Sequence, residues 1–412
     1  MQTKPSIPTI STTLFAAALL AFTPCAPAQP VLTTLHTFQG GTADGSSPFE
    51  VVLGSGGELY GVTGIGGASN DGVVFSLTPP ASSGGAWTEA VYSFPYLTGP
   101  GGPTVTFGGS VLYGTTNTGG RANHGAVVSA TLPLAPSSGR VLHSFTHSAT
   151  GINPVAGVVL GPGGVLYGPT LHGGTYNCGV VFALTPPAAP GGAWTESVIY
   201  SLTKNDGCTQ LYAPLVIDSN GVLYAATETG GRTENGRVFS LTPPSSPGGA
   251  WTKIVIYDFK GKPDGTYPAG LILGPGGLLY GAANRGGSYG SGTVFSLTPP
   301  STQGGAWTET TLYNFTGGYD GNAPQAGVVI GPGGVLYGTT GDAPPNDSGN
   351  VFSLTPPAIP GGAWTEISLY NFTNGPDGGN PSGLVIDSNG VLYGVCITGG
   401  SAGKGTVFSL QP

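Results

Sequence analysis

Residue types that could perform catalysis or bind a metal are sparse in this sequence. The 412 residues include 19 Asp and Glu, 11 Lys and Arg, 5 His and 4 Cys, and only 7% of all residues are charged. Ordinary soluble domains carry about 25% charged residues. The formal net charge is −8, and no run of basic residues occurs. Because nucleic acids and anionic membranes are bound by clustered cations, we expect neither as a partner.

Nine of the 19 carboxylates recur at fixed places, which is typical of a structural role. Four of them lie in the motif Trp-Thr-Glu: Glu89, Glu196, Glu309 and Glu366. Five others come directly before Gly in a turn: Asp44, Asp206, Asp264, Asp320 and Asp377. An Asp in such a turn accepts a backbone N–H group while Gly takes a positive φ. Since Ca²⁺ needs six to eight oxygen ligands, one Asp per turn does not indicate a calcium site.

The five histidines show no spacing typical of metal ligands. His36 and His143 stand where other repeats have tyrosine, so we interpret them as aromatic substitutes. His124, His147 and His172 fall in separate loops. No Gly-x-Ser-x-Gly motif lies on a strand-to-helix turn, where a nucleophilic serine would need to be. The sequence therefore predicts no catalytic residue, no metal and no cofactor.

These residues belong to a unit that occurs seven times. Its Leu-Tyr-Gly or Leu-Tyr-Ala motif recurs every 53 to 57 residues, with the tyrosine at Tyr60, Tyr113, Tyr167, Tyr224, Tyr280, Tyr337 and Tyr393. The motif Val-Phe-Ser-Leu-Thr-Pro-Pro follows it, and Gly-Gly-Ala-Trp-Thr-Glu comes next and contains all five tryptophans. Repeats of this length are typical of solenoids, propellers and arrays. The 76 Gly and 38 Pro then have a place in regularly spaced turns.

Each unit contains four β-like runs, which we call strands A, B, C and D. In the sixth unit they are residues 326–330, 335–340, 350–355 and 364–372. The runs are rich in β-branched and aromatic residues and are bounded by Gly, Pro, Asn or Asp. Four-stranded antiparallel units repeated four to eight times build a β-propeller. We therefore predict an all-β, seven-bladed β-propeller over residues 29–412, with a β-solenoid as the alternative.

The two ends of the repeat region predict how the ring closes. Residues 31–38 match strand D, with Phe38 in the place of Phe94, Phe145, Phe259, Phe315 and Phe372 in other units. The last unit ends after its strand C, at residues 408–410. The N-terminal strand would thus complete the seventh blade and cover two exposed edges.

The pattern LYGxTxxGG, GxVFSLTPP and GGAWTExxLYxF resembles the choice-of-anchor tandem repeat GloVer-containing proteins, the Gloeo/Verruco repeat family. The resemblance covers residues 31–412 and implies bacterial export and a repeat architecture. It implies no reaction and no catalytic residues. Members of that family often carry C-terminal sorting signals, whereas this chain ends at Gln411-Pro412. We expect a released or peripherally held protein.

The first 28 residues are typical of a cleaved export signal. Lys4 supplies a positive charge, residues 14–22 form an apolar run, and residues 26–28 offer small residues for cleavage. The apolar run is shorter than the roughly 20 residues that span a bilayer. We expect an extracellular or periplasmic protein, without a transmembrane segment and most simply a monomer.

Residues that vary between repeats are the candidates for ligand binding. They surround a Gly-Gly pair between strands B and C, in loops that share one face of a propeller with the D–A loops: His172, Tyr176, Glu228, Arg232, Glu234, Arg285 and Tyr289. Function on a repeated scaffold lies where loops vary over a fixed frame. We expect a non-catalytic module that binds a glycan or a protein on this face. The tryptophans that follow the Pro-Pro turns offer an alternative platform, unless they stack on those prolines.

A secreted polysaccharide lyase or glycoside hydrolase is the alternative function. Glycoside hydrolysis needs two carboxylates roughly 5–10 Å apart. Glu228 and Glu234 are the nearest such pair outside the repeated motifs. Arg232 and Arg237 lie in the same stretch, and we expect them to form exposed ion pairs with these carboxylates.

Three cysteines remain beyond the export signal: Cys178, Cys208 and Cys396. Cys178 falls in a B–C loop and Cys208 in the D–A turn after the same blade, and both replace ordinary loop residues. Export exposes the chain to oxidising conditions, so we predict a disulfide between these two. Cys396 lies on a B strand and should be a small buried thiol.

Overall fold

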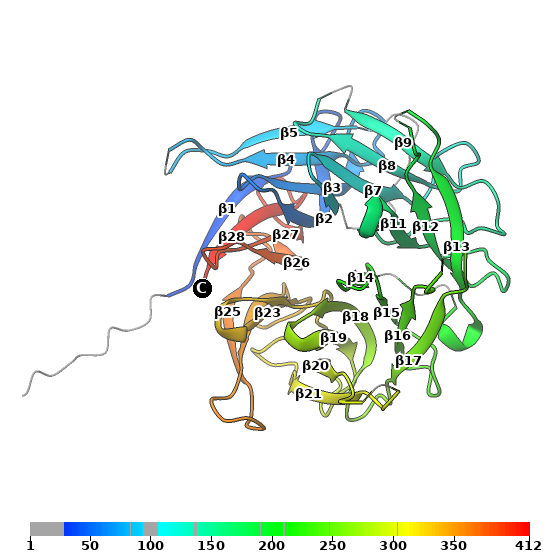
Figure 1. The fold of residues 1–412 in the computed structure, drawn as a ribbon. Helices are drawn as coiled ribbons and strands as arrows, with labels where there is room; N and C mark the ends of the chain where they lie inside the picture. The colour runs from blue at the N-terminus through cyan, green and yellow to red at the C-terminus, as the bar shows by residue number, and fades with distance from the viewer. Residues whose placement is uncertain are drawn as a thin grey trace, which may run out of the picture.

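The computed structural model describes residues 29–82, 84–93, 106–135, 138–189, 191–208, 211, 213–246, 248–302 and 304–412. The chain forms seven antiparallel sheets of four strands each, arranged in a ring (Figure 1). The predicted seven-bladed β-propeller is therefore confirmed. The predicted export signal and Phe94 lie outside the described residues.

The strands run in the order A to D from the centre of the ring outward in every blade. Blade 1 contains β2 (Gly45–Leu53), β3 (Leu59–Gly66), β4 (Val74–Thr78) and β5 (Thr88–Tyr92). Blade 2 contains β6 (Thr106–Gly108), β7 (Val111–Thr116), β8 (Ala126–Thr131) and β9 (Gly139–Ser144). Blade 3 contains β10 (Val159–Leu160), β11 (Leu166–Pro169), β12 (Val180–Thr185) and β13 (Thr195–Ser201). Blade 4 contains β14 (Val216–Ile217), β15 (Leu223–Thr227), β16 (Arg237–Thr242) and β17 (Thr252–Asp258).

The remaining three blades repeat this order. Blade 5 contains β18 (Thr266–Leu273), β19 (Leu279–Arg285), β20 (Thr293–Thr298) and β21 (Thr308–Asn314). Blade 6 contains β22 (Val329–Ile330), β23 (Leu336–Thr340), β24 (Asn350–Thr355) and β25 (Thr365–Asn371). Blade 7 contains β26 (Gly379–Ile386), β27 (Leu392–Thr398), β28 (Thr406–Gln411) and β1 (Val31–Thr37). Four 3₁₀ turns complete the elements: η1 (Pro162–Gly164), η2 (Lys204–Asp206), η3 (Pro275–Gly277) and η4 (Pro332–Gly334).

The N-terminal strand closes the ring, as the sequence predicted. Strand β1 pairs antiparallel with β28, from Val31 opposite Gln411 to Thr37 opposite Thr406. The blue β1 lies beside the red β28 in Figure 1. A strand from one end of the chain thus covers the edge of the last blade. Within the described residues, no helix has the length and apolar character needed to cross a bilayer.

The core consists of phenylalanines that repeat around the ring. The strand-D phenylalanine of one blade packs edge-on against the strand-C phenylalanine of the next, with ring centroids 4.9–5.2 Å apart: Phe38–Phe75, Phe145–Phe182, Phe259–Phe295, Phe315–Phe352 and Phe372–Phe408. All ten side chains are buried. Because each pair joins two blades, the repeated aromatic positions hold the ring together.

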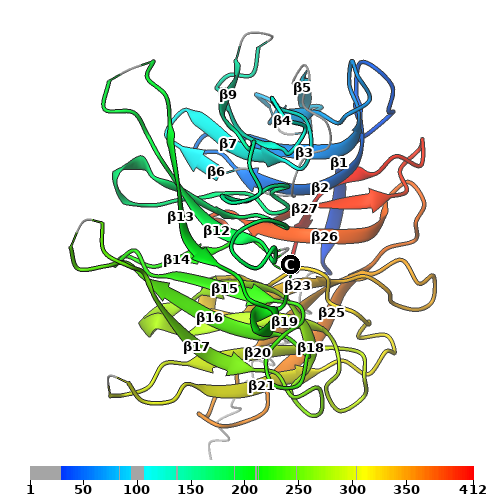
Figure 2. The ribbon, with the colours of Figure 1, turned by 90° about the vertical axis from the view of Figure 1, so that its right-hand side faces the viewer.

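The connections between strands lie on two opposite faces, and the B–C and D–A loops form the face that we call the loop face. There, a residue with positive φ in the D–A loop or at the start of strand A donates its backbone N–H group to a B–C carbonyl of the preceding blade: Ser47 to Lys404, Asn153 to His124, Tyr267 to Asn235, Ala323 to Ser291 and Asn380 to Ser348. The A–B and C–D turns form the other face, the turn face. On it, glycines of the A–B turns lie against prolines of the C–D turns, as Gly277 does against Pro299. Figure 2 shows the blades from the side.

Candidate functional site

Exposed aromatic residues gather on the loop face. Among the described residues, four tyrosines are exposed: Tyr176 (61%), Tyr267 (38%), Tyr289 (65%) and Tyr319 (72%). Tyr176, Tyr289 and Tyr319 lie in B–C or D–A loops and Tyr267 lies at the loop-face end of β18, whereas no exposed Trp, Phe or Tyr of the described chain lies on the turn face. Tyrosine offers a rigid apolar ring with a polar tip, which suits contact with a ligand.

Tyr289 and Tyr319 lie on loops that contact each other. Tyr289 belongs to the B–C loop of blade 5, and Tyr319 belongs to the D–A loop between blades 5 and 6. The backbone N–H of Ala323 donates to the carbonyl of Ser291 at 3.0 Å, which joins these two loops. Neighbouring loops thus present two tyrosines to solvent.

Tyr267 has an unusual backbone conformation. Its φ is +58°, a left-handed value that bulky residues rarely adopt. The other blades have Ser47, Asn153, Ala323 and Asn380 at this place. The conformation lets the Tyr267 N–H reach the Asn235 carbonyl at 3.0 Å. A tyrosine held in a strained conformation, with its side chain exposed, is a feature that clusters at binding sites.

The cations are also concentrated on the loop face. Eight Lys and Arg residues are exposed within the described part of the chain. Seven of them lie in B–C or D–A loops or, for Arg285, at the end of a strand beside them: Arg121, Lys204, Arg232, Lys260, Lys262, Arg285 and Lys404. The eighth is Arg140 on the outer strand β9. A protein with a net charge of −8 therefore carries its exposed positive charge almost entirely on one face.

The structure connects the loops that carry the predicted ligand-binding residues. The disulfide between Cys178 and Cys208 joins the loop of His172 and Tyr176 to the next D–A loop. Backbone hydrogen bonds continue the series of contacts into the loop of Glu228, Arg232 and Glu234 and then into the loop of Arg285 and Tyr289: Gly231 to Asn205 (2.9 Å), Tyr267 to Asn235 (3.0 Å) and Gly287 to Gly261 (3.0 Å). The seven residues thus lie along one continuous band of loops.

Within this band the side chains differ in exposure. Arg232, Glu234 and Arg285 are exposed, like Tyr176 and Tyr289. His172 is half-buried, and its backbone pairs with that of Ile152. Glu228 is also half-buried, and this burial raises the pKa of its carboxyl group. Exposed residues of the band are the ones that a ligand can contact without rearrangement.

The expected ion pairs of the two arginines with Glu228 and Glu234 are wrong. Arg237 is buried at the start of β16, where it donates to Asp258 at 2.6 Å and to Asp206 at 3.0 Å. The register places Arg237 directly opposite Asp258 on β17, so its side chain joins two strands and the D–A turn. The Nε atom of Arg232 lies 3.9 Å from Asp258. A buried guanidinium must be paired with carboxylates, and Asp258 of the outer strand and Asp206 of the turn supply them.

A repeated trio of side chains joins neighbouring blades below the loop face. It consists of a strand-D tyrosine, the Asp of the following D–A turn, and the Glu of the next strand D. Between blades 5 and 6, Tyr313 donates its hydroxyl to Asp320 at 3.0 Å, and Asp320 accepts the Thr316 N–H at 2.8 Å. Asp264 and Asp377 accept equivalent pairs of hydrogen bonds. These Asp residues stabilise the turns, as the sequence predicted.

The glutamates of the trios hold their protons more strongly than ordinary carboxyl groups. Burial raises the pKa of Glu89, Glu309 and Glu366 to about 7. The same shift at three junctions shows that it comes from the repeated frame and not from one specialised catalytic site. Blade 4 differs, because Lys253 replaces the glutamate. Burial opposes ionisation of Asp206 there, but hydrogen bonds from Lys253, Thr203 and Tyr200 lower the pKa of Asp206 to about 2.

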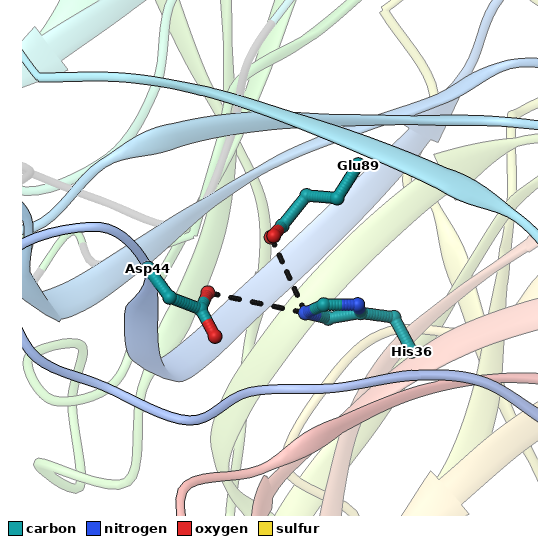
Figure 3. Close-up of side chains that lie close together, drawn as sticks. All are labelled: His36, Asp44 and Glu89. Carbon is teal, nitrogen blue, oxygen red and sulfur yellow. Dashed lines mark ion pairs between the residues drawn. The ribbon is translucent and has the colours of Figure 1, made fainter.

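His36, Asp44 and Glu89 form the candidate metal-binding group among the described residues (Figure 3). The Nε2 atom of His36 lies 3.3 Å from Glu89 and 3.9 Å from Asp44. These residue types can ligate divalent cations. However, the group occupies the place of the Tyr–Asp–Glu trio, and Asp44 already accepts backbone N–H groups from Gln39 and Gly45. We therefore interpret it as the same junction with imidazole in place of phenol, as predicted for His36.

The tryptophans of the turn face pack between blades. Each half-buried ring lies edge-on to the Leu-Tyr-Gly tyrosine of the preceding blade, with centroids 5.7–6.4 Å apart: Trp87–Tyr393, Trp194–Tyr113, Trp251–Tyr167, Trp307–Tyr224 and Trp364–Tyr280. The tyrosine partners of four of the tryptophans are partly exposed, as is Tyr337, and Tyr224 is buried. Rings engaged in this way have a structural use, which weakens the case for a tryptophan platform.

Several features of the loop face were not identified from the sequence. Tyr319 lies in a D–A loop and Tyr267 at the start of strand A, and the candidate residues came only from B–C loops. Tyr267 could have been noticed in the sequence, because it replaces Ser, Asn or Ala in the aligned repeats. The Tyr–Asp–Glu trio was also detectable, since Asp precedes Glu by 45 or 46 residues in three units, as in Asp320 and Glu366.

Comparisons with solved structures find the same fold at low sequence identity. The type IX secretion component PorZ of Porphyromonas gingivalis is 12% identical with a TM-score of 0.55, over 90% of this chain and 47% of that chain. A putative 6-phosphogluconolactonase of Bacteroides uniformis is 15% identical with a TM-score of 0.51, over 85% of this chain and 89% of that chain. Identities this low show a shared fold and nothing of activity.

Sequence comparisons place the chain in a repeat family. No curated protein sequence matches it. The family model of the Gloeobacter/Verrucomicrobia repeat matches residues 88–254 and 155–408, which together cover most of the chain. This agrees with the resemblance carried by the LYG, VFSLTPP and GGAWTE motifs. The chain therefore belongs to the Gloeobacter/Verrucomicrobia repeat family.

Proposed function

We propose that this protein is an exported, non-catalytic binding module that contacts a glycan through its loop face. The observation that carries the proposal is the location of every exposed tyrosine of the described chain on that face. The flat faces of pyranose rings expose C–H groups, which pack well against an aromatic ring. Tyr267, Tyr289 and Tyr319 lie on connected loops, so that one extended ligand could contact them together.

In this proposal, the strands and turns below the loop face form a rigid frame that holds the binding loops. The repeated residues contact one another between blades. They form phenylalanine pairs, tryptophan–tyrosine contacts and Tyr–Asp–Glu trios. The loops above them carry the residues that differ from blade to blade. A rigid frame lowers the ordering cost of binding, because the loops are joined by hydrogen bonds before a ligand arrives.

Export and the monomeric state are part of the same proposal. They rest on the sequence of residues 1–28, on the predicted disulfide and on the resemblance to an exported family. We do not propose the degradative enzyme as a second function, since no observation favours it. Glu228 is half-buried and Glu234 is exposed at the far end of the same loop.

A glycan array with a matched pair of variants tests the proposal. We expect the purified protein to bind a subset of polysaccharides, and Tyr289→Ala with Tyr319→Ala to abolish that binding without loss of stability. Trp307→Ala on the turn face is the matched control and should retain binding. Release of reducing sugar from a bound polysaccharide, with loss of this turnover in Glu228→Gln, would contradict the non-catalytic role.

A further inference from the structure

The distribution of charge on the loop face is uneven. Seven of the 11 Lys and Arg residues of the chain fall within residues 204–285: Lys204, Arg232, Arg237, Lys253, Lys260, Lys262 and Arg285. Arg237 and Lys253 are engaged with Asp206 below the surface. The other five are exposed in the loops of blades 3 to 5. The positive charge of an acidic protein is thus focused on one sector of its loop face.

Three of these cations form no ion pair among the described residues: Lys204, Lys262 and Arg285. Arg232, in contrast, lies 3.9 Å from Asp258. Lys260 lies over the ring of Tyr257, 5.3 Å from its centroid. Glu234 is the one exposed carboxylate of the described loops of blades 4 and 5. The local excess of exposed positive charge is therefore not neutralised by neighbouring side chains.

Two of the unpaired cations, Lys262 and Arg285, lie beside the exposed tyrosines. Arg285 pairs across the sheet with Thr266, which directly precedes Tyr267. Lys262 follows Gly261, whose carbonyl accepts the N–H of Gly287 in the loop of Tyr289 at 3.0 Å. Cations and aromatic rings thus share the two loops where blades 4 and 5 meet.

We propose that the loops of blades 4 and 5 bind an acidic polysaccharide, with uronate carboxylates on Arg285 and Lys262 and sugar rings against Tyr267 and Tyr289. This inference rests on the proposed function, and it names the ligand class. A guanidinium forms two parallel hydrogen bonds with a carboxylate, and a lysine adds a point charge. A uronate polymer offers what the sector requires: regularly spaced carboxylates that alternate with apolar ring faces.

A nucleic acid is a poorer fit to the same surface. Double-stranded DNA carries one negative charge per roughly 1.7 Å and is bound by clustered cations that neutralise several phosphates. The sector has few cations, and the protein as a whole is acidic, with a net charge of −8. Long-range repulsion would therefore oppose a densely charged polymer more than a uronate chain.

Binding measurements on the full chain test this inference. The probes are polygalacturonate, a neutral glucan of similar length and a single-stranded oligonucleotide, at low and at high salt. We expect polygalacturonate to bind more tightly than the other two, with affinity that falls as salt rises. Arg285→Gln with Lys262→Gln should weaken it at least tenfold, and Arg140→Gln, which removes the exposed arginine outside the loops, should not change it.

The other possible results distinguish failure of the acidic-ligand inference from failure of the proposed binding function. Equal binding of the neutral glucan, unaffected by the double substitution, would overturn the acidic ligand while leaving the binding module in place. Tighter binding of the oligonucleotide would overturn the carbohydrate class. Binding of none of the glycans on an array would overturn the proposed function itself. Circular dichroism and thermal melting of each variant separate lost binding from lost folding.

Discussion

The loop face and the turn face are built on the same strands but use their aromatic residues in opposite ways. On the turn face, five tryptophans pack edge-on to tyrosines of the preceding blade. On the loop face, four tyrosines are exposed, and none of their positions holds a tyrosine in more than two of the seven repeats. The contrast indicates that an aromatic residue which recurs in most repeats stabilises the ring, whereas one that occurs in only one or two repeats is available for a ligand.

The polar residues show the same contrast. The Asp and Glu residues of the repeated trios are engaged between blades, and burial raises the pKa of three of these glutamates to about 7. The exposed cations of the loop face, in comparison, occupy positions that hold a cation in no more than two of the seven repeats.

Removal of residues 29–38 should affect both faces together, because both depend on the closed ring. The deletion removes Phe38 from its contact with Phe75 and leaves the edge of β28 unpaired. We expect a loss of about 5 kcal/mol, a large fraction of the roughly 5–15 kcal/mol by which folded domains are stable. Thermal melting measures it, with Val31→Thr as a control at an exposed position. An unchanged melting temperature would contradict closure by β1.

The loop face should lose stability when its disulfide is removed. Cys178 and Cys208 close a loop with a sequence separation of 30 residues. In the chain-entropy model such a cross-link contributes about 3–4 kcal/mol. Urea unfolding of Cys178→Ser with Cys208→Ser checks the magnitude, and Cys396→Ala is the control.

Peptide mapping of the unreduced protein checks the pairing itself. We expect a peptide that links Cys178 to Cys208. Cys396 is fully buried, and burial raises the pKa of its thiol, so alkylation should require unfolding. A link between Cys208 and Cys396 would show that the assigned pairing is wrong.

The sequence predicted the frame well because the frame is repeated. Seven copies of one pattern reveal strand order, blade number and ring closure, and the position of His36 in place of tyrosine reveals its role. It predicted the interactions of Arg237 wrongly, because the two carboxylates that hold it come from positions 21 and 31 residues away. A single copy of an interaction has no period to reveal it.

The candidate site was predictable only in part for the same reason. The varying loops marked the loop face and included Tyr289 and Arg285. The exposure of Tyr319 and the left-handed backbone of Tyr267 depend on how D–A loops dock on neighbouring blades. These contacts join loops about 30 residues apart, and the sequence pattern alone does not show which residues of the two loops meet or which side chains stay exposed.

The turn face should respond to Trp307→Ala through stability alone. The half-buried indole packs against Tyr224 of the preceding blade. Loss of a fully buried Trp costs about 3–5 kcal/mol, so we expect about 2 kcal/mol here. Trp307→Phe should recover part of this loss in urea unfolding. A lost affinity for a glycan, with stability unchanged, would instead favour a tryptophan platform.

The trios predict how stability depends on pH. Because the pKa of Glu366 is about 7 in the folded protein and about 4.5 in an unfolded chain, the folded state binds the proton more tightly. Stability should therefore fall as pH rises from about 5 to about 8. We expect Glu366→Gln to flatten this dependence and to stabilise the protein by about 1 kcal/mol at pH 8. Exposed Glu234→Gln is the control, and an unaltered pH profile of Glu366→Gln would contradict the raised pKa.

The contrast between the two faces is tested most directly by titrating polygalacturonate into a matched pair of variants. One variant combines Tyr289→Ala with Tyr319→Ala on the loop face, and the other combines Trp307→Ala with Trp364→Ala on the turn face. We expect the tyrosine variant to keep its stability and to lose binding of polygalacturonate. The tryptophan variant should lose stability and keep binding. A tyrosine variant that binds like the unaltered protein would contradict the assignment of the loop face as the binding surface.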